Sequence, residues 1–302
     1  MVNYNIKGMG GLSLNLDLLS EIEKKLPELS KGQRNIAQYI VAHYDKAAFM
    51  TASKLGDTIG VSESTVVRFA VELGFQGYPH FQRSLQEMIR NKLTSVQRIE
   101  VSNSQLGASD LLTKVLSMDI DKIRRTLDDI SRDAFNDAVE SIISAENIYV
   151  LGVRSSFSLA SFLSFYLNHI FKNVRNIATN SVSEVFEQIM HIGKGDVLIS
   201  ITFPRYSQRT VKAAKYACGR GAKVISITDS ADSPIAEFSD TLLLARSDMA
   251  SFVDSLVAPL SLINALIVAI GLKNKQSTSD SLERLEQIWD EYGVYQKNEE
   301  NS

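Results

Sequence analysis

The sequence predicts two domains of different fold class: an all-α N-terminal domain, then a doubly wound α/β domain with a parallel sheet of about five strands. In the first third of the chain, apolar residues recur at the spacing of buried helix faces. Beyond residue 146, short apolar runs alternate with helical stretches, as in a parallel sheet covered by helices on both faces. Polar residues and glycine dominate residues 99–109, where we place a linker. The predicted domains are therefore residues 14–98 and 110–290.

Composition narrows the class of protein. The chain has 302 residues, of which 44% are hydrophobic and 22% are charged, which is typical of a soluble protein with room for two domains. The formal net charge of -3 excludes a uniformly basic nucleic-acid coat. Residues 47–98 carry six basic and four acidic residues, or +2, which leaves -5 for the remainder. This imbalance favours a modestly basic docking face in the N-terminal domain.

The single cysteine and the N-terminal residues indicate in which cellular compartment the protein is expected. Cys218 has no partner for an internal disulfide, which suits a reducing cytoplasm, and its place in a predicted helix suggests a small core residue. No signal peptide is evident, because acidic residues interrupt the N-terminal stretch. The most apolar run, residues 256–272, contains Pro259 and polar residues and predicts a buried helix rather than a membrane span. We expect a cytoplasmic protein.

Two short helices near residue 60 organise the N-terminal domain. Thr51 is a good N-cap for a helix over residues 52–59, and Gly60 supplies a sharp turn. Ser62 is a good N-cap for the next helix, and Gly74 stands where a left-handed C-cap is usual. This is the plan of a helix-turn-helix motif. Further helices over residues 18–26 and 79–92, and one that opens with a capping box at Ser30 and Gln33, would support the pair.

The second helix of the pair has one apolar face and one polar face. Hydroxyls and an arginine on the polar face suit phosphate and base contacts, whereas the same helices also fit an ordinary bundle. Tyr78, at the start of the following helix, is placed to reach a phosphate. The candidate DNA-binding residues are Thr51, Ser53, Lys54, Ser62, Ser64, Thr65, Val67, Arg68 and Tyr78.

The amino-acid sequence of this region resembles that of a known family. Residues 51–55, 61–69 and 73–78, together with Phe81, closely resemble the N-terminal domain of RpiR-type bacterial transcriptional regulators. The resemblance covers residues 18–98. It implies that this domain binds operator DNA.

The second half of the chain predicts the α/β domain. Two helices come first, one with an apolar stripe from Leu112 to Leu127 and one over residues 133–143. The predicted strands are residues 148–151, 174–178, 197–201, 224–227 and 242–244. The predicted helices between and after them are residues 156–171, 208–220 and 252–272, with a last helix after residue 277.

Two strand-end loops carry hydroxyls and cations at the start of a helix. Free backbone N–H groups at a helix N-terminus, beside Ser, Thr and Arg, favour anion binding, although Ser and Thr also cap helices without any ligand. The two loops follow neighbouring strands and would converge on one crevice. The candidate effector-binding residues are Gly152, Arg154, Ser155, Ser156, Ser200, Thr202, Arg205, Ser207 and Thr210.

This half resembles the SIS (sugar isomerase) domain over residues 134–273. The matching stretches are residues 152–156, 195–200 and 219–228. The resemblance implies that the SIS domain senses a phosphosugar and mediates oligomerisation, as in RpiR-type regulators. The second loop departs from the usual Ser-x-Ser-Gly-x-Thr pattern, because Phe203 replaces the glycine and residues 204–206 lengthen the loop. Another anionic metabolite therefore remains open.

Together these features predict a DNA-binding transcriptional regulator controlled by a small anionic metabolite, a phosphosugar or related acid. Its expected partners are double-stranded operator DNA, that metabolite and its own copies in a dimer or tetramer, with no cofactor, metal or membrane. The main alternative is a sugar-phosphate isomerase, which needs a base such as His or Glu near the substrate. The two loops contain neither, and Glu184 and His191 are interpreted as surface residues. A third alternative is a regulator of another protein that does not bind DNA.

Overall fold

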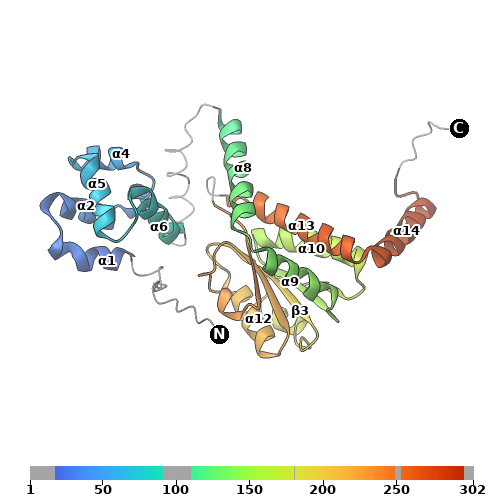
Figure 1. The fold of residues 1–302 in the computed structure, drawn as a ribbon. Helices are drawn as coiled ribbons and strands as arrows, with labels where there is room; N and C mark the ends of the chain where they lie inside the picture. Colours follow the sequence, from blue (N-terminus) through green and yellow to red (C-terminus); the bar gives the residue numbers. More distant parts are fainter. Residues whose placement is uncertain (1–17, 91–98, 100–109, 180, 249–252, 296–302) are drawn as a thin grey trace, which may run out of the picture. The chain divides into compact units, whose positions relative to one another are not determined.

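The computed structural model describes residues 18–90, 99, 110–179, 181–248 and 253–295 (Figure 1). The chain divides into two compact units, Met1–Leu111 and Leu112–Ser302. The predicted linker, residues 99–109, lies outside the described residues apart from Ile99. Within the described residues no single helix is long and apolar enough to cross a membrane; the last two helices meet that test only as a pair, bent by 101°.

The first unit is helical, as the sequence predicts. The capping box is present, since Ser30 N donates to Gln33 Oε1 and Gln33 N donates to Ser30 Oγ. The core contains Phe69 and Phe81, both fully buried and packed edge to face with ring centroids 5.8 Å apart. The elements are α1 (Leu18–Lys25), the 3-10 helix η1 (Leu26–Glu28), α2 (Lys31–Ala42), α3 (Tyr44–Ala47), α4 (Ala52–Ile59), α5 (Glu63–Glu72) and α6 (Tyr78–Arg90).

The second unit is an α/β domain with a five-stranded sheet, which confirms the predicted fold class. Its strands are β1 (Ile148–Gly152), β2 (Val174–Asn176), β3 (Val197–Ile201), β4 (Lys223–Thr228) and β5 (Thr241–Leu244). Its helices are α8 (Leu111–Asp129), α9 (Arg132–Ile143), α10 (Ser155–Ile170), α11 (Val182–Gln188), α12 (Gln208–Gly219), the 3-10 helix η2 (Ala236–Phe238), α13 (Val257–Lys273) and α14 (Lys275–Tyr292). The predicted start of α13, Phe252, lies outside the described residues; the described helix begins at Val257.

The strands are all parallel in the order β2-β1-β3-β4-β5. Each of the three central strands, β1, β3 and β4, is buried almost throughout, because side chains of successive residues enter cores on opposite faces. Ile148 and Val150 of β1 pack in a core with residues of α9, α10 and α13. Tyr149 and Leu151 pack in a second core with residues of α11 and α12. The chain leaves β1 toward β2 and returns to β3 on the other side, so the topological switch point lies between β1 and β3.

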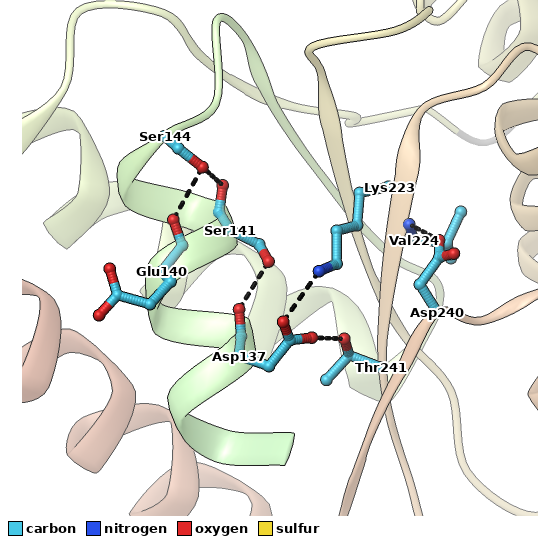
Figure 2. Close-up of polar contacts among 8 residues, drawn as sticks. All are labelled: Asp137, Glu140, Ser141, Ser144, Lys223, Val224, Asp240 and Thr241. Carbon is cyan, nitrogen blue, oxygen red and sulfur yellow. Dashed lines mark hydrogen bonds and ion pairs between the residues drawn. The ribbon is translucent and has the colours of Figure 1, made fainter. Parts of the chain in front are cut away.

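At the amino-terminal ends of β4 and β5, a polar cluster fastens α9 to the sheet (Figure 2). Asp137 of α9 accepts hydrogen bonds from Lys223 Nζ at 3.0 Å and from Thr241 Oγ1 at 2.5 Å. The Thr241 hydroxyl and then the Lys223 ammonium hold the pKa of Asp137 below its ordinary value of 3.8. The neighbouring carboxylate of Asp240 accepts from the backbone N–H of Val224 at 2.8 Å. These contacts lie at the edge opposite the strand ends where parallel sheets bind ligands.

One core prediction is wrong. Cys218 lies on α12, but its side chain is exposed. The inward face of α12 is made by Ala213, Ala214 and Ala217, and position 218 is turned about 100° from position 217, off that face. The residue type predicted a buried side chain, but the position of Cys218 around the helix axis turns it toward solvent.

Candidate nucleic-acid interface and effector pocket

The helix pair in the first unit forms as predicted. Thr51 Oγ1 accepts from Lys54 N at 3.2 Å, and Gly60 ends α4 in the left-handed conformation with φ of 80°. Gly56, which the sequence interpretation did not single out, sets the approach of α5. A Cβ at Gly56 would lie 2.7 Å from the carbonyl oxygen of Val61, a contact too short for any side chain. A glycine inside a predicted helix was the available signal.

Ser62 stands at the N-cap position of α5, but its side chain accepts no hydrogen bond from the helix backbone. Its backbone is extended, as an N-cap requires, yet its Oγ lies 2.9 Å from Ser64 Oγ and 2.8 Å from Thr65 Oγ1. Three hydroxyls therefore gather at the N-terminus of α5. A helix N-terminus with hydroxyls suits a phosphate contact.

The predicted contact residues of α4 and α5 lie on accessible surface. Ser53, Lys54 and Ser64 are exposed, and Val67 is 37% exposed. Arg68 is also exposed, and its Nε donates to the carbonyl of Ser64 at 3.3 Å, which holds the guanidinium along the helix. Thr51 and Ser62 are exposed and Thr65 is half-buried.

Tyr78 is the exception and corrects the prediction. Its side chain is 3% exposed, and its hydroxyl donates to the carbonyl of Met50 at 2.7 Å. Burial raises the pKa of the phenol above its ordinary value of 10.0. Gln82 Nε2 donates to the same carbonyl at 2.8 Å. Tyr78 therefore fastens α6 to the chain before α4 and is not available to a phosphate.

In the second unit, a pocket lies at the carboxyl ends of β1 and β3, at the topological switch point. We call it the strand-end pocket. The two predicted loops meet there, with α10 and α12 beginning beside it. Its lining residues are Val153, Arg154, Ser155, Ser156, Thr202, Phe203, Pro204, Arg205, Ser207 and Asp254.

Both arginines of the strand-end pocket have a strained backbone. Arg154 has φ of 60° and Arg205 has φ of 62°. Among the described residues, Asp110 alone shares a positive φ without being glycine. Such conformations cost about 1–3 kcal/mol each and cluster at functional sites. The two arginines therefore stand at energetically costly backbone positions, and both line the same pocket.

Three predicted effector residues lie outside the lining. Gly152 serves packing, because a Cβ there would lie 2.3 Å from the carbonyl oxygen of Ser156. Ser200 is fully buried within the sheet, and its Oγ lies 2.7 Å from Ser226 Oγ. Thr210 faces the core from α12 and is fully buried. These hydroxyls point into the protein, which sequence spacing alone did not reveal.

Asp254 is a lining residue that the sequence interpretation missed. It precedes α13 and comes from a different strand connection, so no local pattern links it to the two loops. The next residue, Ser255, donates from its hydroxyl to Asp119 Oδ1 of α8 at 2.7 Å. Neither Glu184 nor His191 lines the strand-end pocket, and both are exposed.

Comparison with known proteins agrees with the two-domain organisation. Residues 16–92 match the family model "Helix-turn-helix domain, rpiR family", and residues 141–269 match the model "SIS domain". The HTH-type transcriptional regulator HexR of Escherichia coli (strain K12) is 26% identical over 280 residues, which are 90% of this chain and 94% of HexR.

Two solved structures resemble the fold. The Vibrio vulnificus NanR protein complexed with ManNAc-6P has a TM-score of 0.57 and 23% identity, over 91% of this chain and 99% of NanR. The sugar isomerase domain of an RpiR transcription factor from Sphaerobacter thermophilus has a TM-score of 0.56 and 25% identity, over 59% of this chain and 99% of that domain. The chain is thus an RpiR-type transcriptional regulator, with a DNA-binding helix-turn-helix domain of the rpiR family followed by an SIS domain.

Proposed function

We propose that a small anionic metabolite, a phosphosugar or related acid, binds in the strand-end pocket and controls operator binding by the helix-turn-helix domain. One observation carries the proposal: two arginines with strained backbones, Arg154 and Arg205, line one pocket where two helices begin. Arginine grips phosphate or carboxylate through two parallel hydrogen bonds. The N-termini of α10 and α12 add the positive ends of their helix dipoles.

The pocket also suits the hydroxyl groups of such a ligand. Asp254 brings a carboxylate to a lining whose other polar side chains are hydroxyls and arginines, beside the apolar Val153, Phe203 and Pro204. A carboxylate repels a bare anion but accepts hydrogen bonds from sugar hydroxyls. The lining therefore favours a molecule with one anionic group and several hydroxyls over inorganic phosphate. The NanR structure was solved with ManNAc-6P, a ligand of this class.

A hydrogen-bonded connection runs from the strand-end pocket to α8, the helix at the start of the second unit. Asp254 lines the pocket, and the adjacent Ser255 donates to Asp119 of α8. On the other side of the same β5–α13 connection, the backbone N–H of Arg246 donates to Thr126 Oγ1 of α8 at 2.9 Å. A ligand that shifts this connection would shift α8, through which the chain continues toward the DNA-binding domain.

On the DNA side, we propose that α5 enters the major groove and that the protein works as a homo-oligomer. One helix-turn-helix module covers few base pairs, and such modules bind pairs of half-sites about one helical turn apart. The exposed face of α5, with Ser64, Val67 and Arg68, supports the placement of this helix in the groove. Tyr78 is left out of the proposed contacts because it is buried.

A thermal-shift screen tests the proposed effector class. Phosphosugars, sugar acids and inorganic phosphate are added to wild type, Arg205→Ala and the control Arg220→Ala, which removes the same charge at the far end of α12. A ligand at a hundred times its Kd stabilises the native state by about 2.7 kcal/mol. We expect a phosphosugar or sugar acid to raise the Tm of wild type and Arg220→Ala but not of Arg205→Ala. Equal shifts in all three proteins would contradict the site.

A further inference from the structure

Among the described residues, the last helix, α14, contacts α10 and α13 but contributes no residue to the buried core. α14 is an 18-residue helix, yet none of its residues is buried. It turns by 101° from the direction of α13 and extends outside the layers of sheet and helices (Figure 1). Helices of this length gain most of their stability by packing an apolar face. α14 therefore presents a face that requires a partner.

That face is apolar along one side of α14. Leu282 and Ile288 are each 41% exposed and Tyr292 is 74% exposed, while Leu285 is half-buried. Trp289 is also half-buried, and beyond the helix Tyr295 packs against it edge to face with ring centroids 5.3 Å apart. We call this row the α14 stripe: Leu282, Leu285, Ile288, Trp289 and Tyr292.

A cluster of aromatic rings lies on the exposed side of α10. Phe165 is 58% exposed and Tyr166 is 38% exposed. Phe165 contacts His169 with ring centroids 4.7 Å apart, and Tyr166 contacts Phe162 at 5.0 Å. We call these four residues the α10 aromatic cluster. Clustered exposed aromatic residues are characteristic of protein interfaces.

The two surfaces have opposite charge. α14 contains five acidic and two basic residues, a net charge of -3. Residues 155–175, which include α10, contain no acidic residue and two basic ones, Lys172 and Arg175, both exposed. An acidic helix is repelled by DNA but attracted by the basic end of α10. The charge therefore favours a protein partner that carries the α10 surface, which is a second copy of this chain.

We infer that α14 of one subunit packs its stripe against the α10 aromatic cluster of a second subunit, and that the contact is reciprocal. Within its own chain, α14 contacts α10 and α13, so the stripe and the cluster belong to neighbouring elements. A patch that contains both halves of a complementary pair is self-complementary, as a two-fold interface requires. The inference extends the homo-oligomer of the proposed function by naming its contact surface.

The chain contains a built-in probe of this contact, because Trp289 is its single tryptophan. Intrinsic fluorescence and sedimentation are measured on the full chain across a dilution series. As the oligomer forms, Trp289 emission should move to shorter wavelength and become less accessible to a soluble quencher. Phe165→Ser and Ile288→Ser should each weaken association by about tenfold or more, as expected when a central interface side chain is truncated. Val182→Ser, at an exposed valine of α11, is the matched control and should associate like wild type.

A cross-linking arm tests which surfaces meet. In a Cys218→Ser background, one chain carries Asn168→Cys on α10 and a second, tagged chain carries Gln287→Cys on α14; both positions are exposed. A thiol cross-linker should join the two different chains. No cross-link between chains, or a Trp289 spectrum that is the same for monomer and oligomer, would overturn the inference.

The exposed stripe of α8 offers the rival interface and must be tested beside it. Leu116 and Ile120 are 53% and 56% exposed, respectively. If Leu116→Ser dissociates the oligomer while Phe165→Ser and Ile288→Ser leave it intact, the α10–α14 contact is wrong. If both sets dissociate it, the inference stands and α8 contributes a second contact. In every case the ligand-induced Tm shift of wild type and Phe165→Ser reports separately on the strand-end pocket.

Discussion

The hydroxyl of Ser255 donates a 2.7 Å hydrogen bond to Asp119 Oδ1, which joins the residue beside the pocket wall to α8. The same carboxylate oxygen lies 3.0 Å from Lys122 Nζ, and the Lys122 side chain is only 5% exposed. A buried ammonium that loses its acidic partner is strongly destabilising. Lys122 therefore holds the Asp119 carboxylate in place, and the Ser255 hydroxyl is hydrogen-bonded to that fixed carboxylate. This links the strand-end pocket to the helix nearest the DNA-binding unit in sequence.

The first prediction concerns that link. Ser255→Ala removes the hydrogen bond to α8 but leaves every lining side chain and the Asp119–Lys122 pair. We expect the effector to bind Ser255→Ala as it binds wild type, while its effect on operator affinity falls. Coupling free energies of this kind are about 1–3 kcal/mol.

Operator Kd with and without effector measures the coupling, and the effector-induced Tm shift measures binding. Ser261→Ala is the control, since among the described residues the Ser261 hydroxyl donates to Val257 within α13 and to no other element. Full coupling in Ser255→Ala would show that the signal takes another route.

The second prediction concerns base recognition by α5. Arg68 is exposed and its guanidinium is held along the helix by the carbonyl of Ser64. Arg68→Ala should cost about 1–3 kcal/mol of binding at the operator and little on unrelated DNA. Lys54→Ala should weaken binding to both DNAs alike and reduce the salt dependence by about one phosphate contact. Anisotropy titrations with the two duplexes separate these effects, and an operator Kd unchanged in Arg68→Ala rules out the groove assignment.

The third prediction concerns the cluster of Figure 2 and pH. The pKa of Asp137 is lower in the folded protein than its ordinary value of 3.8, chiefly because Thr241 donates to it. Its carboxylate therefore stabilises the fold above about pH 4, and this contribution is lost as the pH falls through the folded-state pKa. Because the Asp137 side chain is 50% exposed, the contribution is about 1 kcal/mol at most.

Denaturant unfolding of wild type and Asp137→Asn at a series of pH values checks this. The difference in the free energy of unfolding should be largest near neutral pH and should close at low pH. Asp133→Asn, an exposed acid on the same helix, should show a much smaller difference. A difference between wild type and Asp137→Asn that persists unchanged at pH 3 would mean that the carboxylate charge is not what fastens α9.

Local patterns were sufficient to predict the sheet and the helix pair. Strands β1, β3 and β5 are short apolar runs that lead into α10, α12 and α13, and a cap such as Thr51 acts on residues within its own turn. The pocket was predictable for the same reason, because the carboxyl ends of adjacent parallel strands must meet. Arg154 and Arg205 could be placed there from the ends of β1 and β3 alone.

What the sequence could not supply is the direction of individual side chains and contacts between distant segments. Ser200 of β3 and Thr210 of α12 have the right residue type on either side of the second loop, but both point into the core. Tyr78 looked available to DNA until its hydroxyl was seen to be bonded to Met50, 28 residues earlier. Asp254 reaches the pocket from a third strand connection, and its neighbour Ser255 bonds to a helix 136 residues away. Contacts between residues so far apart leave no periodic pattern in the sequence from which they could be predicted.

The most direct measurement is the operator Kd of the full chain, determined by fluorescence anisotropy with and without the best effector from the thermal screen. The operator is a duplex selected by the wild-type protein from a random pool. Wild type and Arg205→Ala should bind it equally well without effector. Saturating effector should change the wild-type Kd by about fivefold or more and leave that of Arg205→Ala unchanged. An effector that raises the Tm of wild type yet leaves its operator Kd unchanged, or that changes both Kd values alike, would contradict control of DNA binding through the strand-end pocket.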